Sequence, residues 1–187
     1  MPKRMWIAVL LMVGFVAGCE VPNPAYDRWD QFDVGSSVTY DATQTMGEES
    51  VDLEITKTLT AKTFNKMTIE TKIIASKDGK TEEIRRSVVE KRFCDPKLHP
   101  STHPSAKVSS GGKRAVIMKG KEPLICKVVV IDVEGKFGEM METEQDLDIE
   151  AAISEEVPGG IVELDLKTKS THFKRSTRAK LKDYVVK

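Results

Sequence analysis

The chain has 187 residues, of which 40% are hydrophobic, and it carries 29 basic and 29 acidic side chains. A chain of this length is typical of one domain and can bury a core without metals or many disulfides. Charges of both signs are interspersed along it, whereas a nucleic-acid-binding protein shows a clustered basic surface. We therefore expect one monomeric domain that does not bind nucleic acid.

The N-terminus has the pattern of a signal peptide. Lys3 and Arg4 precede an apolar run over residues 5–16, which ends in Val-Ala-Gly before Cys19. A positive start, an apolar run of about 7–15 residues and small residues at the end define such a peptide. The run is too short for a membrane-spanning helix, which needs about 20 apolar residues. The pattern predicts a signal peptide over residues 1–18.

The Val-Ala-Gly-Cys sequence resembles the bacterial lipobox, in which the cysteine is acylated after cleavage. That resemblance implies lipid on Cys19, a lipidated tether over residues 19–24 and a domain over residues 25–187. The membrane would then be a partner through this lipid. In proteobacterial lipoproteins an aspartate after the cysteine often means retention at the inner membrane; Glu20 stands here, so the resemblance favours the outer membrane. The alternative is an ordinary secretory cleavage that leaves Cys19 as a free N-terminal thiol.

The other cysteines are Cys94 and Cys126. With Cys19 assigned to lipid, they form an even pair in a chain exported to an oxidising compartment, which favours a disulfide. Such a bond would stabilise the fold by roughly 3–4 kcal/mol. The alternative is two buried, unpaired thiols.

A short helix is expected over Pro24–Phe32. Asn23 suits the N-cap and Pro24 the first helical position. Tyr26, Trp29 and Phe32 are three apart, so one helix face can carry all three rings. We expect this face to pack on the domain; the alternative is an aromatic interface at the membrane surface.

From residue 34 onward the hydrophobic pattern has a period of two, as in Val51, Leu53 and Ile55, which predicts antiparallel strands with one wet face. Turns such as Asp78-Gly79 join them into a meander. The residues from 146 to 154 are compatible with a strand or a helical turn. The fold predicted is one strongly curved antiparallel sheet, or open half-barrel, partly filled by the helix; a two-sheet β-sandwich is the alternative. The strands are expected at Ser37–Thr45, Ser50–Leu59, Lys66–Ser76, Lys80–Phe93, Arg114–Lys119, Leu124–Val133, Lys136–Glu144, Ile161–Thr168 and His172–Val186.

The segment Cys94–Gly112 contains three prolines and is expected to be a long loop. His99 and His103 lie four apart within it, but Pro100 and Pro104 argue against the helix that would bring two imidazoles together. We therefore expect no metal site. Nucleophile-elbow and phosphate-loop motifs are also missing from the sequence, so we expect a protein that is not an enzyme and uses no cofactor.

The most distinctive internal motif is Val157-Pro158-Gly159-Gly160. Pro158 presets its φ angle and the two glycines permit a sharp turn. With Trp29, Phe32, Gly35 and Val38 near the start and a strand after Cys126, the motif resembles small exported β-rich bacterial proteins of unassigned function. These look broadly like lipoprotein-carrier half-barrels, and the resemblance implies no catalytic residues.

Two functions remain open. The first is a non-enzymatic structural or interaction role for a lipid-anchored protein of the cell envelope. The second is a binding module that holds a lipid, an acyl chain or an envelope polypeptide on a curved apolar sheet face.

Overall fold

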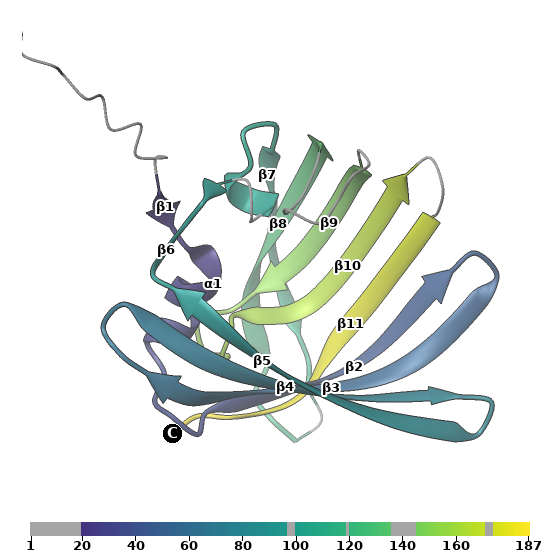
Figure 1. Ribbon diagram of the computed structural model, residues 1–187, viewed down its shortest axis with the longest axis horizontal. Helices are drawn as coiled ribbons and strands as arrows, with labels where there is room; N and C mark the ends of the chain where they lie inside the picture. The colour runs from purple at the N-terminus through teal and green to yellow at the C-terminus, as the bar shows by residue number, and fades with distance from the viewer. Residues whose placement is uncertain (1–19, 97–99, 119, 136–144, 171–173) are drawn as a thin grey trace, which may run out of the picture.

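The computed structural model describes residues 20–96, 100–118, 120–135, 145–170 and 174–187, and it shows a mainly β protein with one α-helix (Figure 1). The predicted signal peptide and Cys19 lie outside the described residues. Nine strands form one antiparallel sheet in the order β5-β4-β3-β2-β11-β10-β9-β8-β7, and β1 pairs with β6 in a second, two-stranded sheet. The element bounds are β1 Val21–Pro22, α1 Pro24–Asp30, β2 Ser37–Met46, β3 Glu49–Lys62, β4 Lys66–Lys77, β5 Lys80–Lys91, β6 Phe93–Cys94, η2 Pro100–Thr102, β7 Lys107–Val116, β8 Leu124–Gly135, β9 Gln145–Ile153, β10 Ile161–Ser170 and β11 Lys174–Val185.

The large sheet consists of two meanders that meet in its middle. Strands β2 to β5 follow one another in chain order on one side, and β7 to β11 do so on the other. The join is the antiparallel pairing of β2 with β11, in which Ala42 lies opposite Ala179. In Figure 1 the strand direction changes markedly across this join. The expectation of antiparallel strands in successive hairpins is confirmed.

The expectation of a single sheet is wrong, because β1 and β6 form a separate ladder. Val21 lies opposite Cys94 and Pro22 opposite Phe93. The Asn23 backbone N–H also donates to the Arg92 carbonyl at 2.9 Å. The predicted tether is therefore held in part against the chain that leaves β5. These two short strands are not half of a sandwich.

The loop expected from Cys94 to Gly112 is shorter than predicted. Strand β7 begins at Lys107, and a 3-10 turn covers Pro100–Thr102. Gly112 (φ +85°) lies at a register shift within the β7–β8 ladder, so the end of the predicted loop belongs to a strand. The ambiguous residues 146–154 are largely strand β9, and the predicted strand Lys136–Glu144 lies outside the described residues.

The helix begins where the cap signals place it. The Asn23 side-chain oxygen accepts from the Ala25 N–H at 2.9 Å, and the helix ends at Asp30, earlier than expected. Tyr26, Trp29 and Phe32 are all buried, so they pack on the domain as predicted. No described helix is long and apolar enough to span a membrane.

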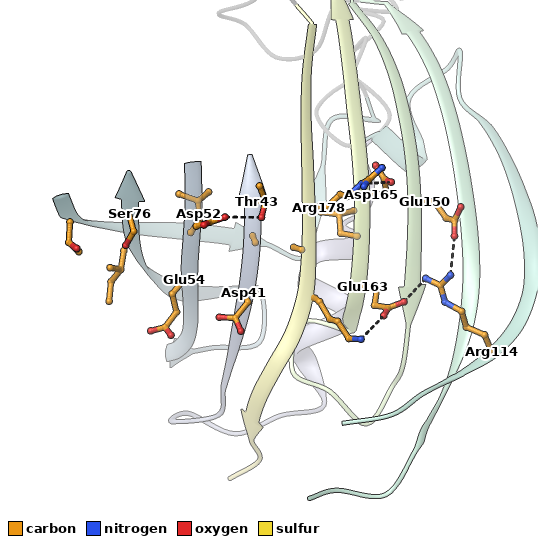
Figure 2. A pocket seen from close by; sticks show the side chains of 17 residues that line it. Asp41, Thr43, Asp52, Glu54, Ser76, Arg114, Glu150, Glu163, Asp165 and Arg178 are labelled. Atoms are coloured by element: carbon orange, nitrogen blue, oxygen red, sulfur yellow. Dashed lines mark hydrogen bonds and ion pairs between the residues drawn. The ribbon is translucent and has the colours of Figure 1, made fainter. Parts of the chain in front are cut away.

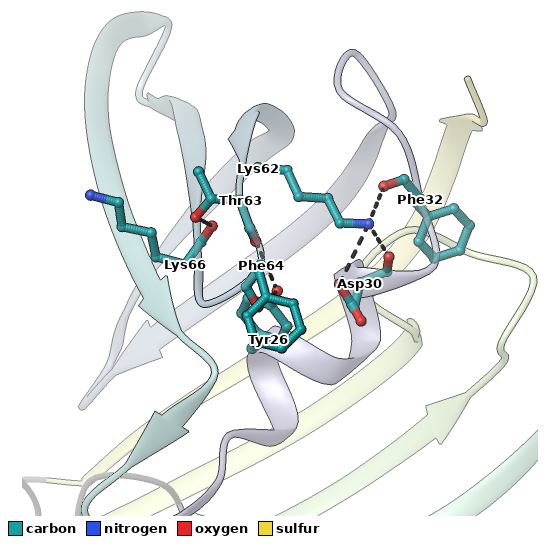
Figure 3. Close-up of polar contacts among 7 residues, drawn as sticks. All are labelled: Tyr26, Asp30, Phe32, Lys62, Thr63, Phe64 and Lys66. Atoms are coloured by element: carbon teal, nitrogen blue, oxygen red, sulfur yellow. Dashed lines mark hydrogen bonds and ion pairs between the residues drawn. The ribbon is translucent and has the colours of Figure 1, made fainter.

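The helix lies over one end of the large sheet (Figure 1). Tyr26 and Trp29 belong to one core cluster with Tyr40, Leu59 and Met67 from β2, β3 and β4. We call the side of the sheet that carries these strand residues the helix face. The Tyr26 hydroxyl donates to the backbone carbonyls of the turn after β3, at 3.1 Å, which fixes the helix to this end (Figure 3).

Candidate functional site

The helix face continues beyond the helix as two cross-strand rows of mainly apolar residues, which we call the apolar rows. Residues opposite one another in a ladder point to the same side of a sheet, so the register defines each row. The first row contains Ala75, Leu53, Ala42, Ala179, Leu164, Ala151 and Val129. The second contains Val51, Gln44, Thr177, Leu166, Ile149, Ile131 and Val108.

The apolar rows are only partly shielded from water. Leu53, Leu164, Leu166 and Ile149 are half-buried, in contrast to Leu59 beneath the helix, which is fully buried. Because the helix has seven residues, it covers one end of the sheet, and no other α-helix of the described residues covers the rest of this face. Aliphatic side chains left half-exposed in adjacent strands form a surface that gains free energy when an apolar partner covers it.

Two positively charged side chains lie where the helix meets the rows. Lys57 is two residues from Ile55 and two from Leu59, so it points to the helix face. Arg28 projects from α1; its aliphatic carbons lie 3.0 and 3.2 Å from the position a Cβ would take on Gly160. Both side chains are half-buried.

The surroundings of Arg28 and Lys57 disfavour their charges. Burial lowers the pKa of Lys57, and repulsion from Arg28 adds to this, while Glu90 opposes it. Burial also lowers the pKa of Arg28, against attraction from Tyr40 and Asp27. No ion pair within 4.0 Å involves either cation in the part of the chain that the structure describes. An anionic group bound here would therefore gain from both cations.

The opposite side of the sheet carries a hollow of about 930 Å³, which extends from β5 to β7 (Figure 2). Nine of its seventeen lining residues are charged, and the strand positions of the first apolar row, Ala42, Leu53, Leu164 and Ala179, also border it. The residues labelled in Figure 2 are Asp41, Thr43, Asp52, Glu54, Ser76, Arg114, Glu150, Glu163, Asp165 and Arg178.

Cross-strand ion pairs organise this hollow. Arg114 on β7 contacts Glu163 on β10 at 2.7 Å and Glu150 on β9 at 3.2 Å. Asp165 pairs with Arg178 at 3.2 Å. The side chain of Glu163 is 25% exposed and the others more so, so each pair stabilises the fold by at most about 1 kcal/mol. The hollow is therefore lined by a cross-strand ladder of partly exposed side chains of opposite charge.

The predicted disulfide between Cys94 and Cys126 is not formed; both are free thiols. Cys94 lies on β6 in the small sheet, whereas Cys126 is fully buried on β8 in the large one. Burial raises the pKa of both thiols. The alternative of unpaired thiols describes this structure, although Cys94 is only half-buried.

The Val157-Pro158-Gly159-Gly160 segment forms a turn that holds α1 against the sheet. Val157 and Pro158 are buried, and the Gly160 N–H donates to the Val157 carbonyl at 2.7 Å. Gly159 has a φ of +76°, and a Cβ placed there would lie 2.9 Å from the Trp29 ring nitrogen. This residue must be glycine for both reasons.

His99 lies outside the described residues. Within the described ranges, His103 and the carboxylates and thiols form no group of three that could hold a metal ion. Sequence reasoning missed Arg28 and Lys57. The two residues are about thirty positions apart, and no local pattern shows that the helix packs near this strand. A lysine on the otherwise apolar side of strand β3 was the one signal that could have drawn attention to this place.

Comparisons with known proteins place few limits on this chain. No family model matches it, and neither does any curated protein. A solved structure that aligns with it is a DUF1329 family protein from Desulfovibrio piger ATCC 29098, at 9% identity and a TM-score of 0.27. The alignment covers 88% of this chain and 93% of that one. A superposition this loose carries no argument about fold or function. The class of this protein is therefore defined by its own structure, which is mainly antiparallel β with one described α-helix at one end of the large sheet.

Proposed function

We propose that this protein is a lipid-anchored, non-enzymatic binding protein of the cell envelope, with the outer membrane favoured, and that the apolar rows of its curved sheet bind the acyl chain of an amphipathic ligand. One observation carries the binding role: the apolar rows continue across the sheet beyond the helix, and several of their larger aliphatic side chains stay partly exposed although Ala42, Ala151 and Ile131 are buried. Leu53, Leu164 and Leu166 belong to this surface.

The ligand proposed is a single acyl chain with an anionic head. The rows offer aliphatic contacts over several neighbouring strands, which suits an extended hydrocarbon chain. Arg28 and Lys57 supply positive charge at the helix end of the rows, where a carboxylate or phosphate head would lie. Each methylene buried on the rows contributes about 0.8 kcal/mol.

A structural or interaction role without a ligand is the second candidate. It is favoured by the packing at the helix end, where Tyr26, Leu59 and Met67 are fully buried. On this proposal the half-exposed apolar rows contact no small molecule, and the charged hollow is a hydrated outer surface.

Native mass spectrometry of the full protein, purified from membranes, tests the ligand. We expect a copurified molecule that is released on denaturation and contains an acyl chain. A fluorescent fatty acid then serves as a binding probe. Protein that carries no ligand and does not bind the probe would contradict the binding role and leave the structural one.

Leu166→Glu and Lys167→Glu form a matched pair, because neighbouring strand residues point to opposite faces. Leu166 belongs to the apolar rows and is half-buried, while Lys167 is exposed on the other side. Leu166→Glu should weaken probe binding by about tenfold or more, equivalent to 1.4 kcal/mol. Lys167→Glu should leave it nearly unchanged. Similar effects for both variants would argue against the apolar rows as the site.

Lys57→Met tests the head end. It should weaken binding of the fatty acid and not of the corresponding fatty alcohol, because only the acid is anionic. Equal loss for both probes would assign Lys57 a packing role.

The anchor is tested separately with Cys19→Ser and cell fractionation. A lipid-anchored protein should move from the membrane fraction to the soluble fraction in this variant. A variant that stays in the membrane fraction refutes lipidation as the means of attachment.

A further inference from the structure

Three segments meet beside the helix at the end of the sheet. They are the turn Thr63–Asn65 after β3, the segment Lys91–Phe93 after β5, and the chain before α1. The Arg92 N–H donates to the Asn65 carbonyl at 3.0 Å, and the Asn23 N–H donates to the Arg92 carbonyl at 2.9 Å. We call the turn Thr63–Asn65, the segment Lys91–Phe93 and the neighbouring Lys66 the rim.

The rim exposes two phenylalanines. Phe64 is 82% exposed and Phe93 is 48% exposed. Figure 3 shows Phe64 at the tip of its turn, whose backbone is held by the Tyr26 hydroxyl. The Arg92 guanidinium carbon lies 4.7 Å from the centre of the Phe64 ring. An exposed phenylalanine contributes little to folding, whereas rings beside basic residues are common where proteins meet the membrane interface.

The rim also places like charges together. Lys66 on β4 lies directly opposite Lys91 on β5. Like charges in a directly opposed pair destabilise a sheet. Neither lysine forms an ion pair with any described residue. The nearby Lys62 is different, because it pairs with Asp30 at 3.4 Å.

Acidic side chains also lie near the rim, among them Glu90, Asp30, Glu20 and Asp95. Glu90 accepts a hydrogen bond from the Asn23 side chain at 2.9 Å, and Asp30 contacts Lys62. Lys66, Lys91 and Arg92 nevertheless form no ion pair with any described residue, and Arg92 stacks on the Phe64 ring instead. Their charges are therefore open to anionic headgroups, which attract basic residues at a membrane surface.

The rim lies next to the start of the described chain. Pro22 lies opposite the exposed Phe93 and Val21 lies opposite Cys94, so the chain runs back from Phe93 toward Asp95 before it reaches Glu20. Glu20 directly follows the cysteine predicted to carry lipid. The exposed rings and the positive group thus lie at the end of the molecule where the described chain begins.

We propose that the rim docks on the membrane surface, with Phe64 and Phe93 inserted at the headgroup level and the basic residues against anionic headgroups. This inference rests on the proposed lipid anchor, which confines the domain near the bilayer. It assigns the anchored protein one orientation, in which the helix end of the sheet faces the membrane.

Fluorescence quenching in vesicles tests this orientation on the full protein. The variants Phe64→Trp and Met46→Trp each add one exposed tryptophan, and the buried Trp29 gives the same background in both. Met46 is 59% exposed at the hairpin that begins β3, whereas Phe64 follows the other end of this 14-residue strand. Vesicles of phosphatidylcholine with phosphatidylglycerol and brominated acyl chains serve as the quencher.

We expect vesicles to quench Phe64→Trp at least about twofold more than Met46→Trp, because bromine on an acyl chain quenches only a tryptophan that comes into close contact with that chain. Adding Lys66→Glu and Lys91→Glu to Phe64→Trp should reduce this quenching with anionic vesicles and change it little with neutral ones. Equal quenching at both sites, or stronger quenching of Met46→Trp, would overturn the docking proposal.

The proposed lipid anchor and the proposed docking surface are tested by separate measurements, so one can be refuted without the other. Mass spectrometry of the purified protein shows whether Cys19 carries lipid. Lipidated protein with equal quenching at both sites would refute docking alone. Protein without lipid that does not sediment with vesicles would refute both proposals.

Discussion

Gly159→Ala provides the sharpest test of how the helix is held. The residue has a φ of +76°, where an alanine costs roughly 1–2 kcal/mol. Its Cβ would also lie 2.9–3.1 Å from three atoms of the Trp29 ring, which is closer than carbon atoms normally approach. Overpacking of this kind costs about 1–3 kcal/mol. The sum is about 2–5 kcal/mol of unfolding free energy.

Gly47→Ala is the matched control. Gly47 has a φ of +63° in a hairpin turn and no heavy atom within 4 Å of its Cβ position. It therefore carries the backbone cost and no steric one. Any change in the entropy of the unfolded chain is common to both variants and cancels in the comparison. The difference between them measures the contact with Trp29.

Urea unfolding followed by circular dichroism measures both variants. We expect Gly159→Ala to lose about 1–3 kcal/mol more than Gly47→Ala, a difference of several degrees in Tm for a domain of this size. Trp29→Leu should remove most of this excess if the ring is its cause. Equal losses for the two glycine variants would refute the close approach of Trp29 to the turn.

Three further predictions concern the cap, the hollow and the buried thiol. Asn23→Ala should reduce the unfolding free energy, measured by urea unfolding, by about 1–2 kcal/mol, because the Asn23 side chain caps α1 and donates a hydrogen bond to Glu90. A change below about 0.3 kcal/mol would contradict the capping role. Arg114→Met should reduce the unfolding free energy by less than about 1 kcal/mol in the same assay, although Arg114 forms two ion pairs. In 1 M salt the difference from the unchanged protein should be smaller still. A larger loss would show that water screens these ion pairs less than their exposure implies. Burial raises the pKa of Cys126 in the folded state, so the unfolded chain loses this proton first and stability should fall as pH rises above about 8.5. Between pH 7 and pH 9.5 the unfolding free energy should fall less in Cys126→Ala than in the unchanged protein. Equal falls in both proteins would exclude this thiol as the cause.

Local sequence signals predicted the repetitive parts of the fold because they report on local geometry. A period of two in Val51, Leu53 and Ile55 leaves little alternative to a strand with one apolar face. Asp78 and Gly79 both adopt positive φ in the predicted hairpin turn. Asn23 caps the helix because its side chain reaches its own chain two residues later.

Contacts between distant parts of the chain were beyond that reasoning. The prolines between Cys94 and Gly112 suggest a long loop, yet residues 107–112 belong to strand β7, because they pair with β8. The cysteine count favoured a disulfide, but the two thiols belong to different sheets. Counting residues cannot show which side of which strand a side chain occupies after folding.

The sequence by itself determined that this protein is a β meander with one capped helix, since hydrophobic period, turn residues and cap residues each act over a few positions. Only the tertiary structure decided that β2 pairs with β11 and that β1 pairs with β6. It also brought Arg28 beside Lys57 and placed Phe64 next to Arg92. These neighbours come together through long-range strand pairing and helix packing, which depend on the whole chain at once and leave no local pattern to read.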